Sequence, residues 1–422
     1  MKVKQNIGVT IVLFSLFFLC GLGISSLSVA KEKISFFCPL SGLEADAMNT
    51  VARDFEKMYP GTEVQVTAVP WSQFNEKLMT AIAGGNIPDA LYLEAMKVVT
   101  YVRGGLIEPL ESYIANDKGL NIEDFFPTTL EIGRYKNTQY AIPLTAAISG
   151  LYYNVDLLKE AGVTPPKTWD EYVTAAKKLN EPKKKIYGTY VGVQRPLLGY
   201  QDRAKTLFAE FFVPNGVELL NKDHTKVVVN SPQAIEATQF IVDLFYKHKV
   251  APLPGAGLDQ EIWGNGLIAL RPEWLWLIQW TRRNAPKLNF RVTLLPAGRA
   301  GHRTLLDCHL LAITSAGKRK ETAYKYISFL DSQGVKWPAR NERLPARKSF
   351  ANLPFYLEDP AWSGFVKQLG YATWTQPKVP MLEEILSALG EELDYAFYQK
   401  KTPEQALNDA ARRGTQLLQE AE

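Results

Sequence analysis

The chain has 422 residues, enough for two or more domains, and 46% of them are hydrophobic, enough to form buried cores. Its formal net charge is only +4, which argues against a nucleic-acid-binding surface, because such surfaces are markedly basic. Four histidines in the whole chain are a poor supply for a metal site or for acid–base catalysis, so we expect no cofactor and no metal.

Residues 1–30 have the layout of a secretory signal peptide. Two lysines precede an apolar run at 7–22, and a small-x-small cleavage site ends at Ala30. Lipid attachment at Cys20 is an alternative, and so is an uncleaved membrane anchor, because the apolar run is close to spanning length. We expect an exported protein, periplasmic or associated with the cell surface, that is cleaved after Ala30.

The next part of the chain alternates strands and helices. Strands are expected at 33–37, 63–69 and 90–93, and helices at 45–58 and 74–83. This order predicts a mainly parallel sheet with helices on both faces. Ligands of such sheets bind beyond the carboxyl ends of the strands, so the loops 39–42, 70–73 and 94–97 are candidate parts of a site.

The stretch 139–180 predicts a crossing from one lobe to a second one. A short strand at 140–143 ends at a proline, and an apolar strand at 151–154 follows. A helix at 156–161 is then closed by Gly162. Thr168 and Glu171 have the spacing of a capping box and predict the start of a further helix.

Later elements extend the second lobe and then return to the first. We expect a strand at 187–193, a helix at 205–212, an apolar segment at 262–270, a strand at 310–314, a helix at 321–330 and another crossing at 341–347. The predicted organisation is a signal peptide at 1–30, an N-terminal lobe at 31–145 plus 309–344, and a C-terminal lobe at 146–308 plus 345–422.

Three segments carry a resemblance to a known family. Tyr140 to Pro143, Leu151 to Asp156 and Ala161 to Glu171 resemble the extracellular solute-binding proteins of bacterial ABC importers, in the branch that takes up sugars. The likeness covers nearly all of the mature chain, and the tail at 401–419 is especially similar to glycerol-3-phosphate-binding proteins. The resemblance implies a two-lobed α/β periplasmic-binding-protein fold of the class II type, in which a hinge joins the lobes.

The same resemblance implies a function. The protein is expected to capture a carbohydrate by hinge closure and to deliver it to the membrane permease subunits of an ABC importer, as a monomer and without catalysis. A glycerol-3-phosphate or phosphodiester ligand is an alternative. A sensing module coupled to a chemoreceptor and a secreted hydrolase are alternatives of other classes, although the sequence has no G-x-S-x-G motif, phosphate loop or separated acid–base pair.

Tryptophans supply the main candidates for sugar binding, because aromatic rings stack on the C–H faces of sugar rings. Resemblance to maltodextrin-binding proteins places Trp274 in a stacking role, with a position in the core as the alternative. Trp276 and Trp280 are expected in the core or on the surface. Asp307 replaces a glycine of the family and favours hydroxyl groups over a phosphate, while Arg343 favours an anion. The full candidate set is Ser41, Trp71, Glu94, Thr145, Gln201, Trp274, Asp307, Arg343 and Trp374.

Cys38 and Cys308 remain in the chain after removal of the signal peptide. In an exported protein the two can form a disulfide, and two buried free thiols are equally consistent with the sequence.

Overall fold

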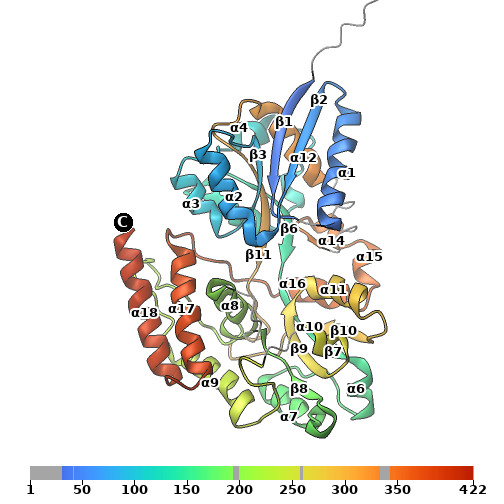
Figure 1. Ribbon diagram of the computed structural model, residues 1–422, viewed down its shortest axis with the longest axis vertical. Coiled ribbons are helices and arrows are strands. Elements are labelled where there is room, and N and C mark those ends of the chain that lie inside the picture. The colour runs from blue at the N-terminus through green and yellow to red at the C-terminus, as the bar shows by residue number, and fades with distance from the viewer. Residues whose placement is uncertain (1–30, 41, 193–198, 257–259, 333–342, 422) are drawn as a thin grey trace, which may run out of the picture.

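The computed structural model describes residues 31–40, 42–192, 199–256, 260–332 and 343–421, and it shows two lobes (Figure 1). The predicted signal peptide and its alternatives, and the candidate Ser41, lie outside the described residues. Within the described ranges, no helix combines the length and the apolar character needed to span a bilayer.

The first lobe, at the top of Figure 1, is built on a sheet with the strand order β12-β6-β11-β3-β1-β2. Its strands are β1 (Glu32–Cys38), β2 (Thr62–Ala68), β3 (Ala90–Glu94), β6 (Ile142–Ala147), β11 (Asp307–Ile313) and β12 (Leu344–Pro345). The helices around it are α1 (Leu43–Met58), α2 (Trp71–Ala83), α3 (Lys97–Arg103), α4 (Glu111–Asn116), α5 (Pro127–Ile132), α12 (Lys320–Ser332) and α14 (Lys348–Ala351), with a short 3-10 turn, η1 (Ile122–Asp124), and a small hairpin of β4 (Arg134–Tyr135) and β5 (Thr138–Gln139).

The second lobe contains a smaller sheet with the order β10-β7-β9-β8. Its strands are β7 (Ser149–Asn154), β8 (Tyr187–Thr189), β9 (Ile268–Trp274) and β10 (Phe290–Thr293). The surrounding helices are α6 (Val155–Glu160), α7 (Trp169–Leu179), α8 (Tyr200–Leu207), α9 (Pro232–Tyr246), α10 (Gln260–Gly264), α11 (Trp276–Asn284), α15 (Pro354–Leu357), α16 (Trp362–Leu369), α17 (Leu382–Phe397) and α18 (Pro403–Glu420), with the 3-10 turn η2 (Pro182–Lys184) and a π-helical turn η4 (Phe208–Phe212) that continues α8.

Both sheets are mixed, which corrects the prediction of mainly parallel sheets. β1 pairs in parallel with β2 and β3, as expected, but β11 lies between β3 and β6 and runs antiparallel to both. Among the described strands of the second lobe, only the pair of β8 and β9 is parallel. The physical reason is that strands returning from the other lobe enter each sheet from the opposite end.

The crossing between the lobes is short. β6 of the first sheet and β7 of the second are separated by a single residue, Ile148, which is fully buried. β11 pairs with β6 along this crossing, so two chain segments run side by side at the junction. This arrangement fits the predicted passage from lobe to lobe near residue 146, while the lobe boundaries as a whole stay a prediction.

The local signals around the crossing are largely confirmed. Gly162 follows the end of α6 with a φ of 59°, a left-handed conformation that glycine adopts without strain. The Thr168 hydroxyl caps α7 by accepting from the Glu171 backbone amide. The Glu171 carboxylate, however, accepts from the amide of Lys167, so the capping box is formed in only one direction.

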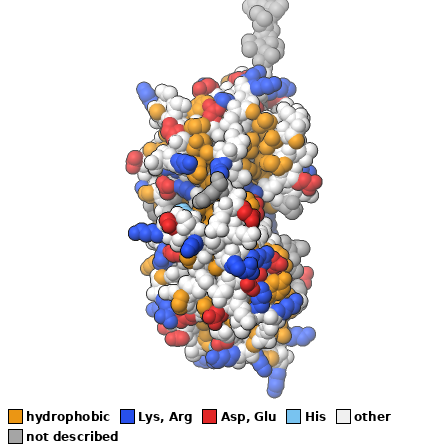
Figure 2. Space-filling model, turned by 90° about the vertical axis from the view of Figure 1, so that its left-hand side faces the viewer, with side chains coloured by type: hydrophobic (Ala, Val, Ile, Leu, Met, Phe, Trp, Pro, Cys, Tyr) orange, Lys and Arg blue, Asp and Glu red, His pale blue; other side chains and the backbone are white. Residues whose placement is uncertain are grey.

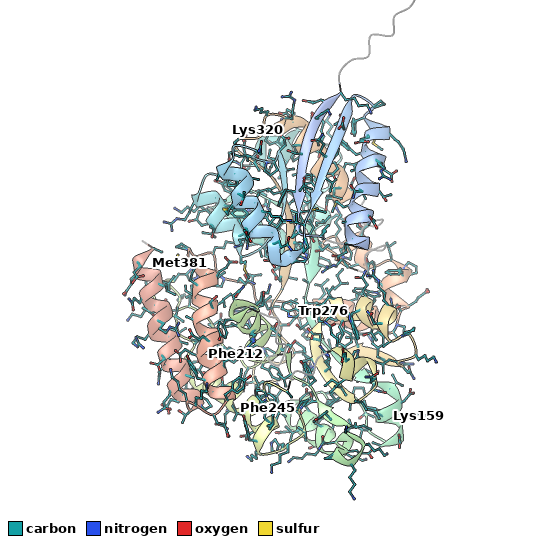
Figure 3. The ribbon with its side chains drawn as sticks, viewed as in Figure 1. Lys159, Phe212, Phe245, Trp276, Lys320 and Met381 are labelled. Atoms are coloured by element: carbon teal, nitrogen blue, oxygen red, sulfur yellow. The ribbon has the colours of Figure 1, made fainter. Side chains whose placement is uncertain are left out.

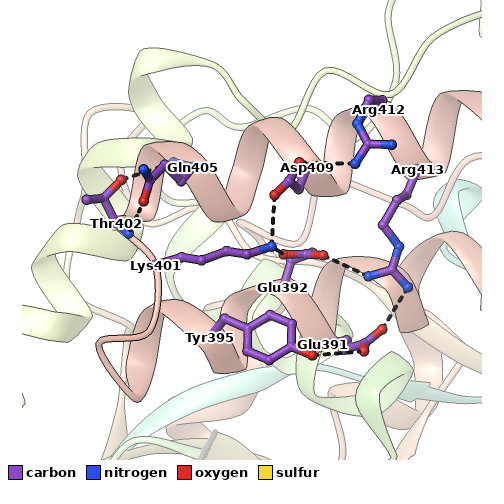
Figure 4. Close-up of polar contacts among 9 residues, drawn as sticks. All are labelled: Glu391, Glu392, Tyr395, Lys401, Thr402, Gln405, Asp409, Arg412 and Arg413. Atoms are coloured by element: carbon purple, nitrogen blue, oxygen red, sulfur yellow. Dashed lines mark hydrogen bonds and ion pairs between the residues drawn. The ribbon is translucent and has the colours of Figure 1, made fainter.

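The last two helices are joined by a network of charged side chains (Figure 4). Lys401 Nζ lies 2.5 Å from Glu392 Oε2 and 2.8 Å from Asp409 Oδ2, and Arg413 binds both Glu392 and Glu391 at 2.8 and 2.7 Å. These contacts tie α18 to α17 and to the turn between them. Elsewhere, Figure 2 shows basic and acidic side chains interspersed over the face it displays, in line with the small net charge.

The two cysteines of the described chain are free and buried. Cys38 lies on β1 and Cys308 on β11, with β3 between these strands. Two strand spacings are about 9.6 Å, beyond the Cα separation that a disulfide can bridge. Of the two alternatives from the sequence, the structure therefore has the pair of buried thiols.

Candidate ligand-binding site

A cavity of about 660 Å³ lies between the two lobes. Both lobes contribute to its wall, and Trp276 lies at the edge of the second lobe that faces the first (Figure 3). The lining residues are Glu44, Trp71, Glu94, Ala147, Asp202, Lys205, Thr206, Trp274, Leu275, Trp276, Gln279, Trp280, Arg283, Asn284, Asp307, His309 and Arg343.

The ends of several strands position this wall. Glu94 is the last residue of β3, Ala147 the last of β6 and Trp274 the last of β9, whereas Asp307 is the first residue of antiparallel β11. The carboxyl ends of strands in both sheets therefore meet at the cavity, as expected for an α/β protein. Trp71 is the first residue of α2. The helix thus begins three residues earlier than the sequence pattern predicts.

Lys205 of α8 lies at the centre of an acidic cluster. Its ammonium is 3.2 Å from Asp307 Oδ2, 3.6 Å from Glu94 Oε1 and 3.7 Å from Asp202 Oδ1. Burial alone would lower the pKa of Lys205, but the three carboxylates outweigh it and raise that pKa. Burial raises the pKa of Glu94, Lys205 opposes this shift, and the neighbouring Asp307 and Asp202 add to it.

This cluster has three carboxylates and one ammonium, so its formal charge is negative when all four groups are ionised. Carboxylate oxygens accept hydrogen bonds from hydroxyl groups and repel a phosphate. The Glu94 side chain remains 24% exposed, so its carboxylate is accessible to a ligand from the cavity.

Tryptophan rings form much of the remaining wall. The Trp71 residue is 37% exposed, whereas Trp274 is only 9% exposed. The Trp274 indole donates from Nε1 to Thr206 Oγ1 over 3.0 Å, and Lys205 Nζ lies 5.9 Å from the ring centroid. Trp276 and Trp280 on α11 also line the cavity, which corrects the expectation that they are core or surface residues.

Arg343 reaches the cavity but already has an acidic partner. Its Nη2 and Nε donate to Glu44 Oε1 over 2.6 and 3.2 Å, and both side chains are 15% exposed. On the sequence alone, Arg343 favours an anionic ligand. In the structure Glu44 offsets that charge, and the argument for an anion becomes weaker.

His309 on β11 is a further polar group of the wall. Its Nδ1 lies 2.9 Å from the Tyr92 hydroxyl and 3.3 Å from the Thr145 hydroxyl. The ring centroid is 5.2 Å from that of Trp71. Thr145, a predicted site residue, is thus buried behind His309 and does not itself line the cavity.

Two other predicted site residues lie elsewhere. Gln201 accepts a hydrogen bond from Ser387 of α17 over 3.5 Å and is absent from the cavity wall. Trp374 stacks on Phe208 with a centroid distance of 5.1 Å and donates from Nε1 to Glu218 over 2.7 Å. Its ring is thereby occupied by packing within the second lobe. Five predicted residues do meet at the cavity: Trp71, Glu94, Trp274, Asp307 and Arg343.

The sequence contained one overlooked signal. Trp276, Gln279, Trp280, Arg283 and Asn284 follow the spacing of a single helix face, and all five line the cavity from α11. Lys205 and His309 had no comparable signal, because a lone lysine on a helix and a lone histidine on a strand are ordinary residues. Among the described residues, no group of three or more histidine, cysteine or carboxylate side chains is arranged to hold a metal.

Comparison with known proteins identifies the family. Residues 41–337 match the bacterial extracellular solute-binding protein family. The chain belongs to this family. Among curated relatives of this solute-binding protein, the sn-glycerol-3-phosphate-binding periplasmic protein UgpB of Shigella dysenteriae is 25% identical over 439 residues, which cover 95% of this chain and 96% of UgpB.

Solved structures of similar proteins have the same two-lobed fold. The ABC substrate-binding protein Lmo0181 from Listeria monocytogenes, in complex with cycloalternan, has a TM-score of 0.80 and 26% identity, over 92% of this chain and 99% of that chain. Maltose-bound MalE3 from T. maritima has a TM-score of 0.78 and 27% identity, over 92% and 100% of the two chains. The solute-binding protein described here thus has the α/β fold that its sequence predicts.

Proposed function

We propose that this protein captures a neutral carbohydrate in the cavity between its lobes and delivers it to the membrane permease of an ABC importer. The observation that carries the proposal is the composition of the cavity wall. Four tryptophans, Trp71, Trp274, Trp276 and Trp280, line the same cavity as the carboxylates that cluster around Lys205. Apolar rings combined with a few fixed polar groups are the general form of a small-ligand site, and they match the apolar faces and hydroxyls of a sugar.

Two of the similar structures support the same ligand class. Lmo0181 was solved with cycloalternan and MalE3 with maltose, and both ligands are carbohydrates. Both proteins cover nearly the whole length of this chain. Family membership and these structures also favour a role outside the cytoplasm, in the periplasm or at the cell surface, and binding without chemical turnover.

Glycerol 3-phosphate is the second candidate, because UgpB is similar over 95% of this chain. Its phosphate would need uncompensated positive charge in the cavity. The buried cation Lys205 is surrounded by acids, and Arg343 is paired with Glu44. Arg283 also lines the cavity, from α11, but it is exposed, so solvent and salt screen its charge. This distribution of charge favours the neutral sugar over the phosphate ester.

Closure of the lobes is the mechanism that fits the geometry. Ligand contacts from Trp71 and Glu94 on one lobe and from Trp274 on the other coexist only when the lobes approach each other. Ligand therefore shifts the population toward the closed state by its differential affinity.

A thermal-shift screen tests the proposal. The panel contains maltose, longer and cyclic glucans, monosaccharides, polyols and glycerol 3-phosphate, each at millimolar concentration. A ligand present at 100 times its Kd stabilises the fold by about 2.7 kcal/mol, which is easily measured. We expect stabilisation by at least one neutral sugar, followed by calorimetric titration of that sugar. Stabilisation by glycerol 3-phosphate alone, or by no member of the panel, would overturn the neutral-sugar proposal.

A further inference from the structure

His309 has two ring nitrogens in different surroundings. Nδ1 is buried against the hydroxyls of Tyr92 and Thr145, at 2.9 and 3.3 Å. Nε2 has no hydrogen-bond partner among the described residues, and the ring borders the cavity between the lobes. The side chain therefore has one nitrogen fixed from behind and one nitrogen available to a ligand.

The ring is neutral at pH 7. Burial lowers the pKa of His309 well below its ordinary value, and the positive charges of Arg343 and Lys205 lower it further. A neutral imidazole carries a single N–H, and the hydrogen bond at one nitrogen decides which nitrogen that is. The Tyr92 phenol is the more acidic hydroxyl of the two neighbours and the stronger donor, and donation from it to Nδ1 would leave the proton on Nε2.

We propose that His309 is a specificity-determining residue of the ligand site, which donates one hydrogen bond from Nε2–H to an oxygen of the sugar, and that Tyr92 is the positioning residue that holds this tautomer. The proposal rests on the proposed function for the nature of the ligand. It adds a fixed donor to a wall whose carboxylates, Glu94, Asp202 and Asp307, only accept when ionised. A sugar hydroxyl both donates and accepts, and this wall offers partners for both roles.

The position of the ring supports this assignment. His309 lies opposite Glu94 in the register of β11 and β3, so a fixed donor and a fixed acceptor are neighbours on adjacent strands. Trp71 lies against the same imidazole, with centroids 5.2 Å apart and an interplanar angle of 37°. A sugar packed on the exposed part of Trp71 would thus have His309 and Glu94 within reach at its edge.

The first experiment measures the tautomer. The protein is labelled with ¹⁵N-histidine, and long-range ¹H–¹⁵N correlation spectra are recorded at pH 7 without ligand. The His309 signals are assigned from their loss in His309→Gln. We expect a neutral ring protonated at Nε2, and a partial shift to the other tautomer in Tyr92→Phe. A ring protonated at Nδ1, or a charged ring, would overturn the proposal.

The second experiment measures affinity, by calorimetric titration with the sugar that stabilises the wild-type protein most. Glutamine places its amide nitrogen near the position of Nε2, whereas asparagine places it near Nδ1. We expect His309→Gln to bind within about threefold of the wild type and His309→Asn to bind at least about tenfold more weakly, the range for one lost hydrogen bond. The sugar affinity of Tyr92→Phe should lie between the affinities of these two variants.

His302→Gln is the matched control. His302 is half-buried, contacts the Leu295 carbonyl oxygen through Nδ1 and does not line the cavity, so its substitution should leave affinity unchanged. If the wild type binds a sugar and His309→Asn binds it equally well, the proposed role of His309 is overturned and the proposed function is not. Absence of any sugar binding by the wild type would overturn the proposed function, and the tautomer spectra would still decide whether Nε2 carries the proton.

Discussion

Lys97 of α3 and Glu383 of α17 form an ion pair between the two lobes, with 2.5 Å between Nζ and Oε2. The pair lies outside the cavity wall, and a second pair, Lys378 with Glu131, joins the lobes in the same region at 2.6 Å. These contacts exist only while the lobes are close together. They therefore favour the approach of the lobes without touching the ligand.

Removal of the first pair should weaken ligand binding indirectly. Partly exposed ion pairs contribute up to about 1 kcal/mol, so Lys97→Met should lower sugar affinity by at most about fivefold. Small-angle scattering of the ligand-free variant should show a larger radius of gyration than the wild type. Lys247→Met is the control, because Lys247 caps the end of α9 and its partner Asp243 is on that helix, in the same lobe. Equal affinity and equal scattering in Lys97→Met and the wild type would show that the pair does not bias the lobes.

Two tryptophans of the cavity should respond differently to truncation. Trp71 is 37% exposed, so Trp71→Ala should change the melting temperature little and weaken sugar binding about 30-fold or more, as for a central aromatic contact. Trp274 is 9% exposed and hydrogen-bonded to Thr206, so Trp274→Ala should also lower stability by about 3–5 kcal/mol. Denaturant unfolding and titration of both variants separate the two effects. A Trp71→Ala variant that binds normally would exclude that ring from the site.

The Glu94 carboxyl should make stability depend on pH. Burial raises its folded-state pKa above the ordinary value of 4.5, so the folded protein keeps this proton to a higher pH than the unfolded chain. The unfolded state then binds fewer protons in that window, and the contribution of Glu94 to stability falls as the pH rises above about 4.5. Glu94→Gln should remove this decrease, so the variant gains stability relative to the wild type between pH 4 and pH 7.

The same substitution should weaken ligand binding, because a neutral amide is a poorer hydrogen-bond acceptor than a carboxylate. We expect a loss of sugar affinity of about tenfold, the equivalent of 1.4 kcal/mol. Glu76→Gln, on the exposed side of α2, provides the control for affinity. Melting curves across the pH range and titrations at pH 7 measure both effects. A stability advantage of the wild type over Glu94→Gln that grows as the pH rises would contradict the assigned direction of the Glu94 pKa shift.

Lys205 should stabilise the cavity wall through its three acidic neighbours. Lys205→Met leaves Glu94, Asp202 and Asp307 without their shared cation, and loss of one partner from a buried charge cluster costs about 3–5 kcal/mol. A second substitution, Asp307→Asn, should restore part of that loss, and a double-mutant cycle measures the coupling. Lys184→Met, in an exposed pair with Glu181, should have no measurable effect. Additive effects of the two cavity substitutions would mean that Lys205 and Asp307 are not coupled.

Local sequence signals predicted the fold up to the point where distant strands pair. The apolar strand at 151–154, Gly162 and Thr168 each specify local structure, and each has the expected conformation. The insertion of β11 between β3 and β6 depends on pairing with strands far away in the chain, which periodicity does not encode. For this reason the alternation of strands and helices was correct, while the mainly parallel sheet was not.

In the candidate site too, local sequence signals predict some residues, whereas others depend on neighbours from distant parts of the chain. Glu94 and Trp274 were predicted because they follow apolar strands, and strand ends converge at the cavity. Lys205 and His309 gain their significance from three-dimensional neighbours, namely Asp307 and Tyr92, that the sequence does not place beside them. Trp374 lies outside the cavity wall, because an aromatic residue in a loop packs as readily on Phe208 as on a sugar.

The two buried cysteines make the protein well suited to fluorescence measurements. Burial raises the pKa of both thiols, and since the thiolate is the reactive form, Cys38 and Cys308 should resist alkylation in the folded state. Cysteines introduced on the surface of each lobe, for example in place of Met58 and Lys400, would then react selectively with a donor and an acceptor dye. Energy transfer between such dyes would turn the mature protein into an optical reporter of its own ligand.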